Sequence, residues 1–407
     1  MRTLFVCAAF AAAFVPASAR AQTVALTESQ VVAQLGAGSP RVAAARAAVD
    51  VARADVLSAA RWPNPRFTFN REAVAGVAEN IFTVAQPLPI TGVRRFDVSA
   101  ANARVEASSF RAEDRIRRVR ADVRLVFTDL WAAQEREREL ARSRDRLDEL
   151  ARILARREEA GEAAGFDRLR AEREVADVDA TRAMAAAERA QAQAMLASFL
   201  SAPPAPAAIE AVMPAAPGAL LPTVDELVAR AETSRGDLVA LARELEAAGF
   251  AEQAAGRRAI PEPEVVAGTK TSNAAGGDVG SIVSVHVALP LFDRGRPERA
   301  LAEARGRQAR AEADVLRQTI RAQISAWRAA LVERRANAER HRAALGAASD
   351  RIERIAQISY EAGERGILEL LDAYRTAAAA RVRQTEFDAS VHEAEIELEF
   401  VSGWEIP

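Results

Sequence analysis

The sequence predicts a mainly α-helical protein with a small β part, built from two copies of one long unit. Residues 159–169 and 361–371 carry the same glycine-bearing turn, about two hundred positions apart. Before each turn lie a proline-flanked segment typical of β-strands and a proline-free helical run of roughly 65 residues. A helical hairpin of that length is too long to bury itself in a compact globule, so we expect a tube or stalk.

Residues 1–21 have the pattern of an export signal that is cleaved just before Gln22. Arg2 supplies a positive charge, residues 4–15 form a short apolar run, and small residues follow. The alternative is an uncleaved membrane anchor, although the apolar run is short for a bilayer. Cys7, the single cysteine, is an alternative lipidation site, but it lies inside the apolar run. Cleavage would leave a mature chain without disulfides or thiolates.

The composition argues against nucleic acid as a partner and against a hydrophobic membrane helix in the mature chain. The 55 basic and 57 acidic residues nearly balance, which does not favour nucleic acid as a partner. After residue 21, no run of 18 apolar residues occurs, so a mature chain that crosses a membrane would not do so with a hydrophobic helix.

The first repeat is predicted to cover residues 22–200. A capping-box pattern at Thr27 predicts a helix to Leu35, and Pro40 opens a second helix to about Ala60. A β-hairpin is expected at about 64–88, because Phe67 and Phe69 alternate with polar neighbours. A long helical hairpin then follows at about 93–200, with its turn near Gly161.

A proline-rich linker at 201–224 separates the repeats, and the second repeat is predicted to cover residues 225–407. It repeats the same order: a helix at 234–258, a β-hairpin at about 262–290 and a helical hairpin at about 297–402. The rising helix of that hairpin is predicted to run unbroken to residue 362, because the stretch after Pro297 contains no proline.

Two strands per repeat give four per chain, and this number has a consequence. A four-stranded sheet has free edges, and unpaired backbone groups at such edges are not tolerated in lipid. Several chains must therefore each contribute four strands to close a membrane barrel, and we expect the protein to oligomerise.

Three motifs, placed in order along the repeats, resemble one family. They are residues 86–95 before the first long helix, residues 289–295 before the second, and residues 361–364 with 368–373 around the second turn. Together they resemble the TolC-type outer membrane efflux proteins, and most closely the CzcC-like branch that serves heavy-metal cation pumps.

This resemblance implies a homotrimer whose chains together form a twelve-stranded β-barrel in the outer membrane of a Gram-negative bacterium. Below it would hang an α-barrel tunnel of twelve helices, largely periplasmic and surrounded by a mixed equatorial region that contains the linker. The tunnel would dock a periplasmic adaptor protein and an inner-membrane RND pump. The chain would be a passive conduit, with drug efflux or type I protein secretion as alternatives and a periplasmic coiled-coil scaffold as a different class.

The resemblance also assigns roles at the turns. Tyr360, Arg365, Glu369 and Asp372 match the positions that close the tunnel at its periplasmic tip, although the family pattern has Asp where this chain has Glu369. Around a threefold axis, Glu369 and Asp372 would form rings of like charge that attract cations, with Arg365 as a suitable partner.

Adaptor contact is assigned to both turns, at residues Gly161, Gly165, Asp167, Gly363 and Gly366. The alternative for the glycines is that they only end helices. Asp167 matches Glu369 across the repeat, whereas Arg170 stands where Asp372 stands.

No pattern in the sequence predicts an enzyme, a cofactor or a metal site. His286, His341 and His392 lie far apart, without the spacing of metal ligands, and each is interpreted as a surface or lumen residue. No catalytic triad or phosphate-binding loop is found. The charged runs 115–118 and 135–139 are interpreted as solvated helix faces.

Overall fold

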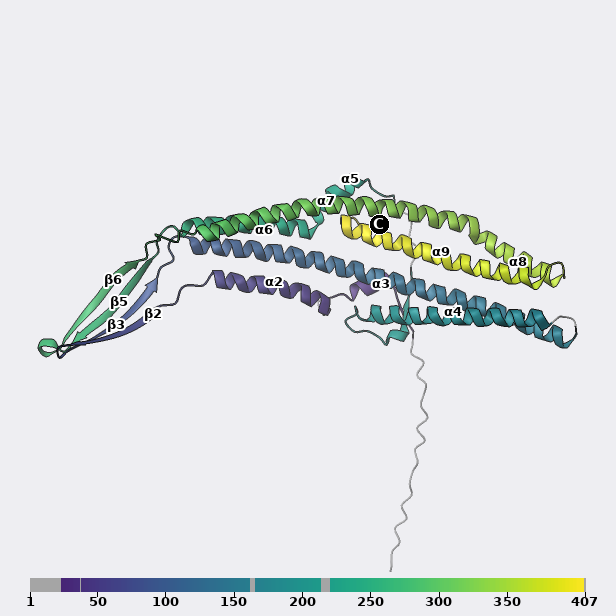
Figure 1. Ribbon diagram of the computed structural model, residues 1–407, viewed down its shortest axis with the longest axis horizontal. Coiled ribbons are helices and arrows are strands. Elements are labelled where there is room, and N and C mark those ends of the chain that lie inside the picture. Colours follow the sequence, from purple (N-terminus) through teal and green to yellow (C-terminus); the bar gives the residue numbers. More distant parts are fainter. Residues whose placement is uncertain (1–22, 37, 162–164, 214–219, 406–407) are drawn as a thin grey trace, which may run out of the picture.

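A computed structural model describes residues 23–36, 38–161, 165–213 and 220–405. The predicted export signal lies outside these residues, as do positions 162–164 of the first turn and 214–219 of the linker. The chain is a long rod with a β-sheet at one end and two helical turns at the other (Figure 1). The predicted mainly α architecture with a four-stranded sheet is confirmed.

The first repeat follows the predicted order of elements. It consists of α1 (Glu28–Ala33), α2 (Pro40–Ala59), β2 (Arg66–Val74), β3 (Val77–Pro87), α3 (Val93–Glu159) and α4 (Gly165–Ala197). The predicted capping box is present, since the Thr27 side chain accepts from the Gln30 N–H while the Gln30 side chain accepts from the Thr27 N–H. At 1.5 Å per residue, the 67 residues of α3 span roughly 100 Å.

The second repeat has the same order, with one interruption that the sequence analysis did not predict. It consists of α5 (Val224–Ser234), α6 (Gly236–Arg257), β5 (Pro263–Ser272), β6 (Asp278–Val287), α7 (Arg296–His341), a π-helical turn (Arg342–Gly346), α8 (Ala347–Glu361) and α9 (Ile367–Ser402). A 3-10 turn (Ala274–Gly276) joins β5 to β6.

The helix predicted at 234–258 corresponds to α6, and α5 precedes it. Arg235 has an extended backbone between α5 and α6, and a side chain on Gly236 would collide with the Phe110 carbonyl of α3. The helix predicted to run unbroken to residue 362 is interrupted at Arg342–Gly346 instead. A π-helical turn keeps a helical backbone with i→i+5 hydrogen bonds, so the absence of proline could not exclude it.

Part of the predicted linker is a structured element. Ile209–Ala211 forms β4, preceded by a 3-10 turn (Pro206–Ala208), and β4 pairs in parallel with β1 (Val24–Leu26). Two buried glutamines hold this strand: Gln134 Oε1 accepts from the Ala211 N–H at 2.9 Å, and Gln193 Nε2 donates to the Ile209 carbonyl at 2.8 Å. The linker is therefore fixed to α3 and α4.

The four long strands form one antiparallel sheet in the order β2-β3-β5-β6. Because the strands are in register, one face gathers apolar side chains that are all exposed: Phe67, Phe69, Phe82, Val84, Val265, Val283, Val285 and Val287. The opposite face is polar and includes ion pairs between Lys270 and Glu79 at 2.6 Å and between Arg66 and Glu264 at 3.5 Å. The two faces of the sheet therefore differ in polarity.

A left-handed glycine turns the chain from each hairpin into its long helix. Gly92 and Gly295 precede α3 and α7 with φ of 84° and 75°. Only glycine adopts this backbone without strain, which explains why both motifs carry glycine at this place.

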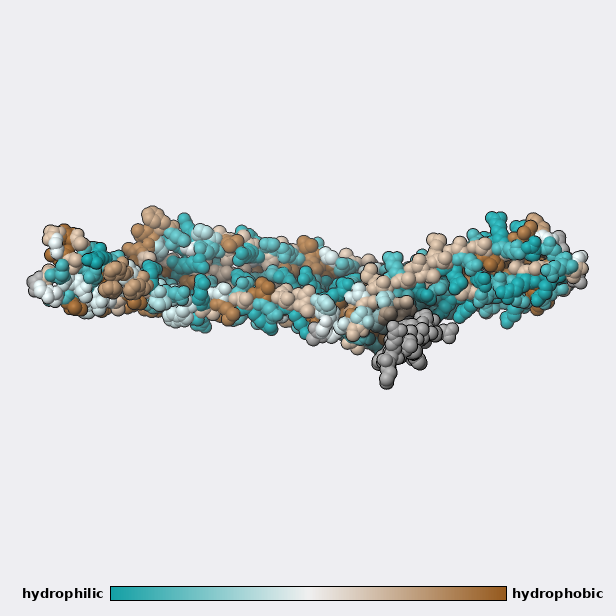
Figure 2. Space-filling view, turned by 90° about the horizontal axis from the view of Figure 1, so that it is seen from below, coloured by the Kyte–Doolittle hydropathy of each residue, from teal (hydrophilic) through white to brown (hydrophobic). Residues whose placement is uncertain are grey.

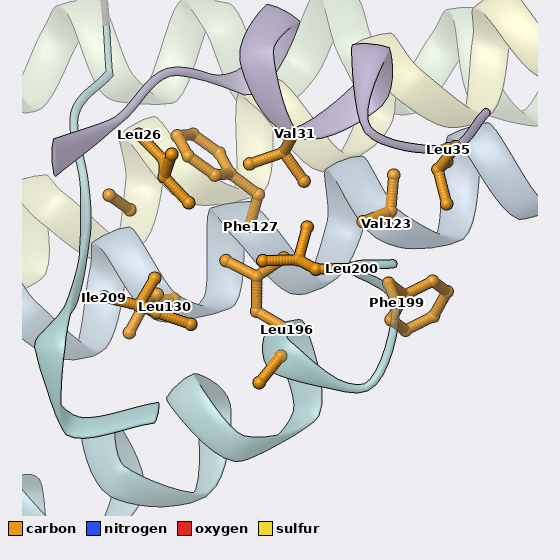
Figure 3. Packing of buried hydrophobic residues seen from close by; sticks show 12 residues of the cluster. Leu26, Val31, Leu35, Val123, Phe127, Leu130, Leu196, Phe199, Leu200 and Ile209 are labelled. Carbon is orange, nitrogen blue, oxygen red and sulfur yellow. The ribbon is translucent and has the colours of Figure 1, made fainter. Parts of the chain in front are cut away.

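Helix α3 is the central element of the rod, because α2, α4, α6 and α9 all pack on it. It lies between α2 and α6 near the sheet (Figure 1). Beyond the middle of the rod, which we call the waist, it lies between α4 and α9. At the waist, Val123, Phe127 and Leu130 of α3 pack with apolar residues of the N-terminal segment, α4 and β4 (Figure 3). This cluster fastens the first described residues and the linker to the middle of the rod.

A buried ionic cluster fastens the same region to the second repeat. Arg124 of α3 contacts Glu28 of α1 and Glu399 of α9, while the ring of His392 lies 2.8 Å from Glu28 Oε2 and 3.3 Å from Glu395 Oε2. Burial alone would lower the pKa of His392, but the hydrogen bonds to Glu28 and Glu395 raise it to about 9. His392 is thus a partly buried cation at neutral pH that is held between helices, and not the surface or lumen residue expected from the sequence.

We predict that this cluster makes stability fall as the pH rises. The pKa of His392 is about 9 in the folded chain and 6.5 for an ordinary histidine, so its contribution is complete below pH 6.5 and is lost as the pH rises through 9. The full effect is on the order of 3 kcal/mol per chain. The thermal unfolding midpoint, followed by circular dichroism, should drop between these pH values, and His392→Gln should flatten this dependence.

His341→Gln is the matched control, because the His341 ring bonds to Gln384 at 2.9 Å and not to a carboxylate. It should leave the pH dependence of the wild-type chain unchanged. A His392→Gln chain that loses stability with pH as steeply as the wild type would contradict the role of the imidazolium.

Candidate functional site

The two helical turns lie beside each other at the end of the rod far from the sheet (Figure 1). A single apolar cluster joins them and draws on α3, α4, α8 and α9. Its larger members are Leu147, Leu150, Leu154, Ile367, Leu370, Leu371 and Tyr374. The two hairpins of one chain therefore form a single four-helix tip, and the side chains on it are held in fixed positions.

Gly161 and Gly363 end their helices in the same way. Both have φ of 76°, and their N–H groups donate to the carbonyls of Glu158 at 2.9 Å and Tyr360 at 3.0 Å. A Cβ at either glycine would meet no atom within 4 Å. The positive φ, and not crowding within the chain, thus accounts for glycine here, and the space above both turns is open.

The other two predicted glycines differ from this pair. Gly165 begins α4, and a Cβ there would lie 2.5 Å from Glu158 Oε1. Gly366 precedes α9 with an extended backbone (φ −83°, ψ 171°), so its conformation does not require glycine.

Tyr360 connects the two hairpins. Its side chain packs against the apolar cluster of the tip, near Arg157 of α3 and Asp167 of α4. Burial raises the pKa of Tyr360; Asp167 adds to this and Arg157 opposes it. The hydroxyl therefore stays protonated and contacts the first hairpin of its own chain.

Arg365, Glu369 and Asp372 are exposed around the start of α9, whose opposite side buries Ile367 and Leu370. Among the residues that the structure describes, none of these three charged side chains forms an ion pair. One chain thus does not bring the four predicted gate residues together: Tyr360 faces inward, and the three charges remain available to other partners.

The first turn is different, because its Arg168 forms ion pairs within the chain. Arg168 contacts Glu158 across the turn at 2.6 Å and Glu172 at 2.7 Å. Arg170, which stands where Asp372 stands in the second repeat, lies 5.7 Å from the centre of the Phe166 ring. The two copies of the turn have therefore diverged in charge and in pairing.

Sequence reasoning missed an ionic network above the tip. Arg381 of α9 contacts Glu139 of α3 at 2.6 Å, and Asp350 and Glu353 of α8 at 2.8 and 3.2 Å. The Glu139 side chain is only 7% exposed, and Arg146 contacts both Glu139 and Glu353. The network joins the two hairpins where the apolar cluster ends.

The interpretation of runs 115–118 and 135–139 as solvated faces was therefore wrong for part of each run. Glu139 is buried in this network, and Arg118 makes two 2.9 Å hydrogen bonds to Glu397 of α9. Seven or eight residues are about two helical turns, so Glu139 lies near the same face of α3 as Arg146 and the buried Leu147. This spacing could have indicated from the sequence alone that Glu139 points inward.

The structure provides a basis for neither a metal site nor a membrane helix in the part of the chain that it describes. Within the described ranges, no three His, Cys, Asp or Glu side chains come together as metal ligands would. His286 is exposed on the sheet, 3.3 Å from Ser284 Oγ, and His341 packs against Phe387. None of the described helices combines the length and apolar character needed to cross a bilayer.

Comparison with known proteins gives a consistent result. The family described as outer membrane efflux protein matches residues 31–202 and 227–403, which is most of both repeats. The cobalt-zinc-cadmium resistance protein CzcC of Cupriavidus metallidurans is 26% identical over 377 residues, covering 91% of this chain and 88% of that protein.

Solved structures have the same fold. A membrane protein from Pseudomonas aeruginosa superposes with a TM-score of 0.75 at 21% identity, covering 92% of this chain and 93% of the other. CusC, whose structures concern transmembrane channel formation, gives a TM-score of 0.73 at 16% identity over 94% of this chain and 93% of its own.

Proposed function

This chain belongs to the outer membrane efflux protein family, and from that membership we propose that three copies form the outer membrane channel of a tripartite efflux system for heavy-metal cations. The channel would be a passive conduit, fed by a periplasmic adaptor and an inner-membrane RND pump. Membership contradicts the periplasmic scaffold that was considered as a different class.

The observation that carries this proposal is the pair of matched open edges along one chain. The edge strands of the sheet are β2 and β6. In the adjoining helical layer, the outer helices are α2 and α7. Since β2 follows α2 and α7 follows β6, each edge continues from sheet to helices. Both helical edges expose apolar residues, which are Val51 and Leu57 on α2 and Leu301 and Val315 on α7. Joining three chains edge to edge gives twelve strands and hides these residues.

The tip charges support a gate in such a trimer. Three copies of Glu369 and Asp372 would approach one another around the axis, and like charges repel unless a cation intervenes. Arg365, which forms no ion pair among the described residues of its own chain, is suited to bind a carboxylate of the next copy. Such a lock opens when a partner separates the hairpins, without covalent chemistry.

Adaptor contact is proposed at the two turns. Gly161 and Gly363 have open space above them, so a helical hairpin of an adaptor can approach the backbone closely. Asp167, Gly165 and Gly366 lie on the same end of the rod and would border that contact.

The cargo is proposed from the named relative and from charge. CzcC is described as a cobalt-zinc-cadmium resistance protein, and an unpaired acidic tip suits cations. Drug efflux and type I protein secretion remain the alternatives within the same fold.

We predict a trimer for the purified protein in mild detergent. Light scattering with subtraction of the detergent mass should give about three times the mass of one chain, because the open edges of one sheet need partners. A stable monomer would rule out the shared barrel.

We predict a leakier tip when its charges are removed. Glu369→Ala combined with Asp372→Ala, or Arg365→Ala alone, should raise single-channel conductance in planar bilayers several-fold, because the proposed lock is lost. The double variant should also lose preference for cations over anions.

The control for the tip is Glu361→Ala combined with Glu364→Ala, which removes equal charge from exposed positions of the same turn. It should leave conductance near the wild-type value. An equal rise in both double variants would show general loosening of the turn and would remove Glu369 and Asp372 from the gate.

We predict metal sensitivity when the gene is deleted. Growth should be inhibited at lower concentrations of cobalt, zinc and cadmium salts, and the wild-type gene should restore it. A loss of resistance to drugs with unchanged metal tolerance would favour the drug-efflux alternative.

A further inference from the structure

The junction between sheet and helices has a surface that the channel function does not require. Each of the four connections between a strand and a helix exposes an apolar residue next to the sheet: Trp62 before β2, Ile90 after β3, Ile260 before β5 and Phe292 after β6. Phe292 is 99% exposed, and Leu289 and Leu291 beside it are also exposed. Figure 2 shows apolar surface protruding where the sheet meets the helices.

Arginines accompany these apolar residues on the helical side at every connection. Arg61 adjoins Trp62, Arg95 follows Ile90, Arg258 lies near Ile260, and Arg294 and Arg296 follow Phe292. Moving from sheet to helices, each connection therefore passes from exposed apolar side chains to guanidinium groups. Two of the four connections contain the left-handed glycines Gly92 and Gly295 between these groups.

Most of these arginines have no carboxylate partner among the residues that the structure describes. Within those ranges, Arg61, Arg95, Arg294 and Arg296 are exposed and form no salt bridge, whereas Arg258 contacts Glu298 at 2.7 Å. Two carboxylates lie in the same segments and pair with none of these arginines among the described residues: Glu262 accepts from Thr91 Oγ1 at 2.6 Å, and Asp293 accepts from the Gly295 N–H at 3.0 Å. Residues 60–65, 88–96, 257–262 and 288–296 together contain seven arginines and these two carboxylates, so the junction carries net positive charge.

Trp62 is held in place by a further arginine of the junction, Arg94. Arg94 donates through Nε to the Ala60 carbonyl at 2.8 Å and lies 5.6 Å from the centre of the Trp62 ring. An aromatic ring supported in this way keeps its exposed side toward the surroundings. Tryptophan prefers the boundary between hydrocarbon and headgroups, because its ring is apolar and its N–H is polar.

We propose that the junction binds anionic phospholipid headgroups of the periplasmic leaflet, with the apolar residues in the acyl region and the free arginines on the phosphates. This inference rests on the proposed membrane insertion of the sheet. It follows from continuity, since the junction extends the exposed apolar face of the sheet, and from charge complementarity. A neighbouring copy or an adaptor would leave the repeated apolar-then-arginine order unexplained.

Tryptophan fluorescence tests the depth. The chain has four tryptophans, so Trp131→Phe, Trp327→Phe and Trp404→Phe together leave Trp62 as the reporter. In vesicles of phosphatidylethanolamine and phosphatidylglycerol, lipids brominated near the headgroup should quench Trp62 more than lipids brominated near the chain end. If the triple variant does not fold, the difference in quenching between the wild type and Trp62→Phe reports the quenching of Trp62.

Lipid competition tests the charge. Brominated phosphatidylglycerol should quench Trp62 several-fold more effectively than brominated phosphatidylethanolamine at equal content. Replacing Arg61, Arg95, Arg294 and Arg296 by Gln should bring this ratio close to one. The control replaces four exposed arginines of α7 and α8 by Gln: Arg305, Arg310, Arg351 and Arg354. This variant should keep the wild-type ratio of quenching by the two lipids.

Two outcomes overturn the inference while the proposed channel stands. One is a trimer that conducts in bilayers but whose Trp62 is not quenched by any brominated lipid, which would place protein over the junction. The other is an unchanged lipid ratio in the junction variant. A chain that neither forms trimers nor conducts would instead refute the channel itself.

Discussion

The hydrogen bonding of four strands is the constraint on which the rest of the molecule depends. The sheet β2-β3-β5-β6 pairs its inner strands completely and leaves β2 and β6 with one open side each. One face of this sheet is apolar and exposed, so neither water nor lipid suits an isolated chain. Edge-to-edge association satisfies the backbone and gives each face its own medium. The helical layer also has two open edges, since α2 and α7 continue the two edges of the sheet toward the tip.

Duplication supplies two hairpins of equal plan, and their differences show how the copies divide their tasks. The first hairpin has an unbroken α3 and a turn whose Arg168 pairs within the chain. The second is interrupted by a π-helical turn at Arg342–Gly346 and ends in a turn whose Arg365, Glu369 and Asp372 are exposed. Under the proposed gate, the first copy would be the fixed support and the second the movable part.

The sequence predicted what periodicity and local chemistry specify. The long helices, the capping box at Thr27 and the strands around Gly76 follow from spacing, caps and turn residues. The short parallel pair β1–β4 was missed, because three-residue strands far apart in sequence carry no periodic signal. Glu139 and His392 were placed on the surface for a related reason: a charge is assigned to solvent unless its partner on another helix is known. At the tip, the turn glycines follow from local rules, whereas the proposed pairing of Arg365 with another copy involves residues far beyond local sequence.

The apolar contacts between the long helices are gathered in separate clusters, and ionic contacts lie between and beside these clusters. Besides the clusters at the waist and the tip, α5, α6, α7 and α9 form a third and α2 and α3 a fourth, while the Arg381 network and the His392 cluster join the same long helices at other points. Buried ion pairs add little net stability but strongly penalise misalignment, because a displaced partner leaves a charge unpaired. Rods of this length have many nearly equivalent registers, since alanine-rich faces slide past one another easily. The ion pairs therefore fix the register of each helix, and with it the heights of the tip charges and of the two open edges along the rod.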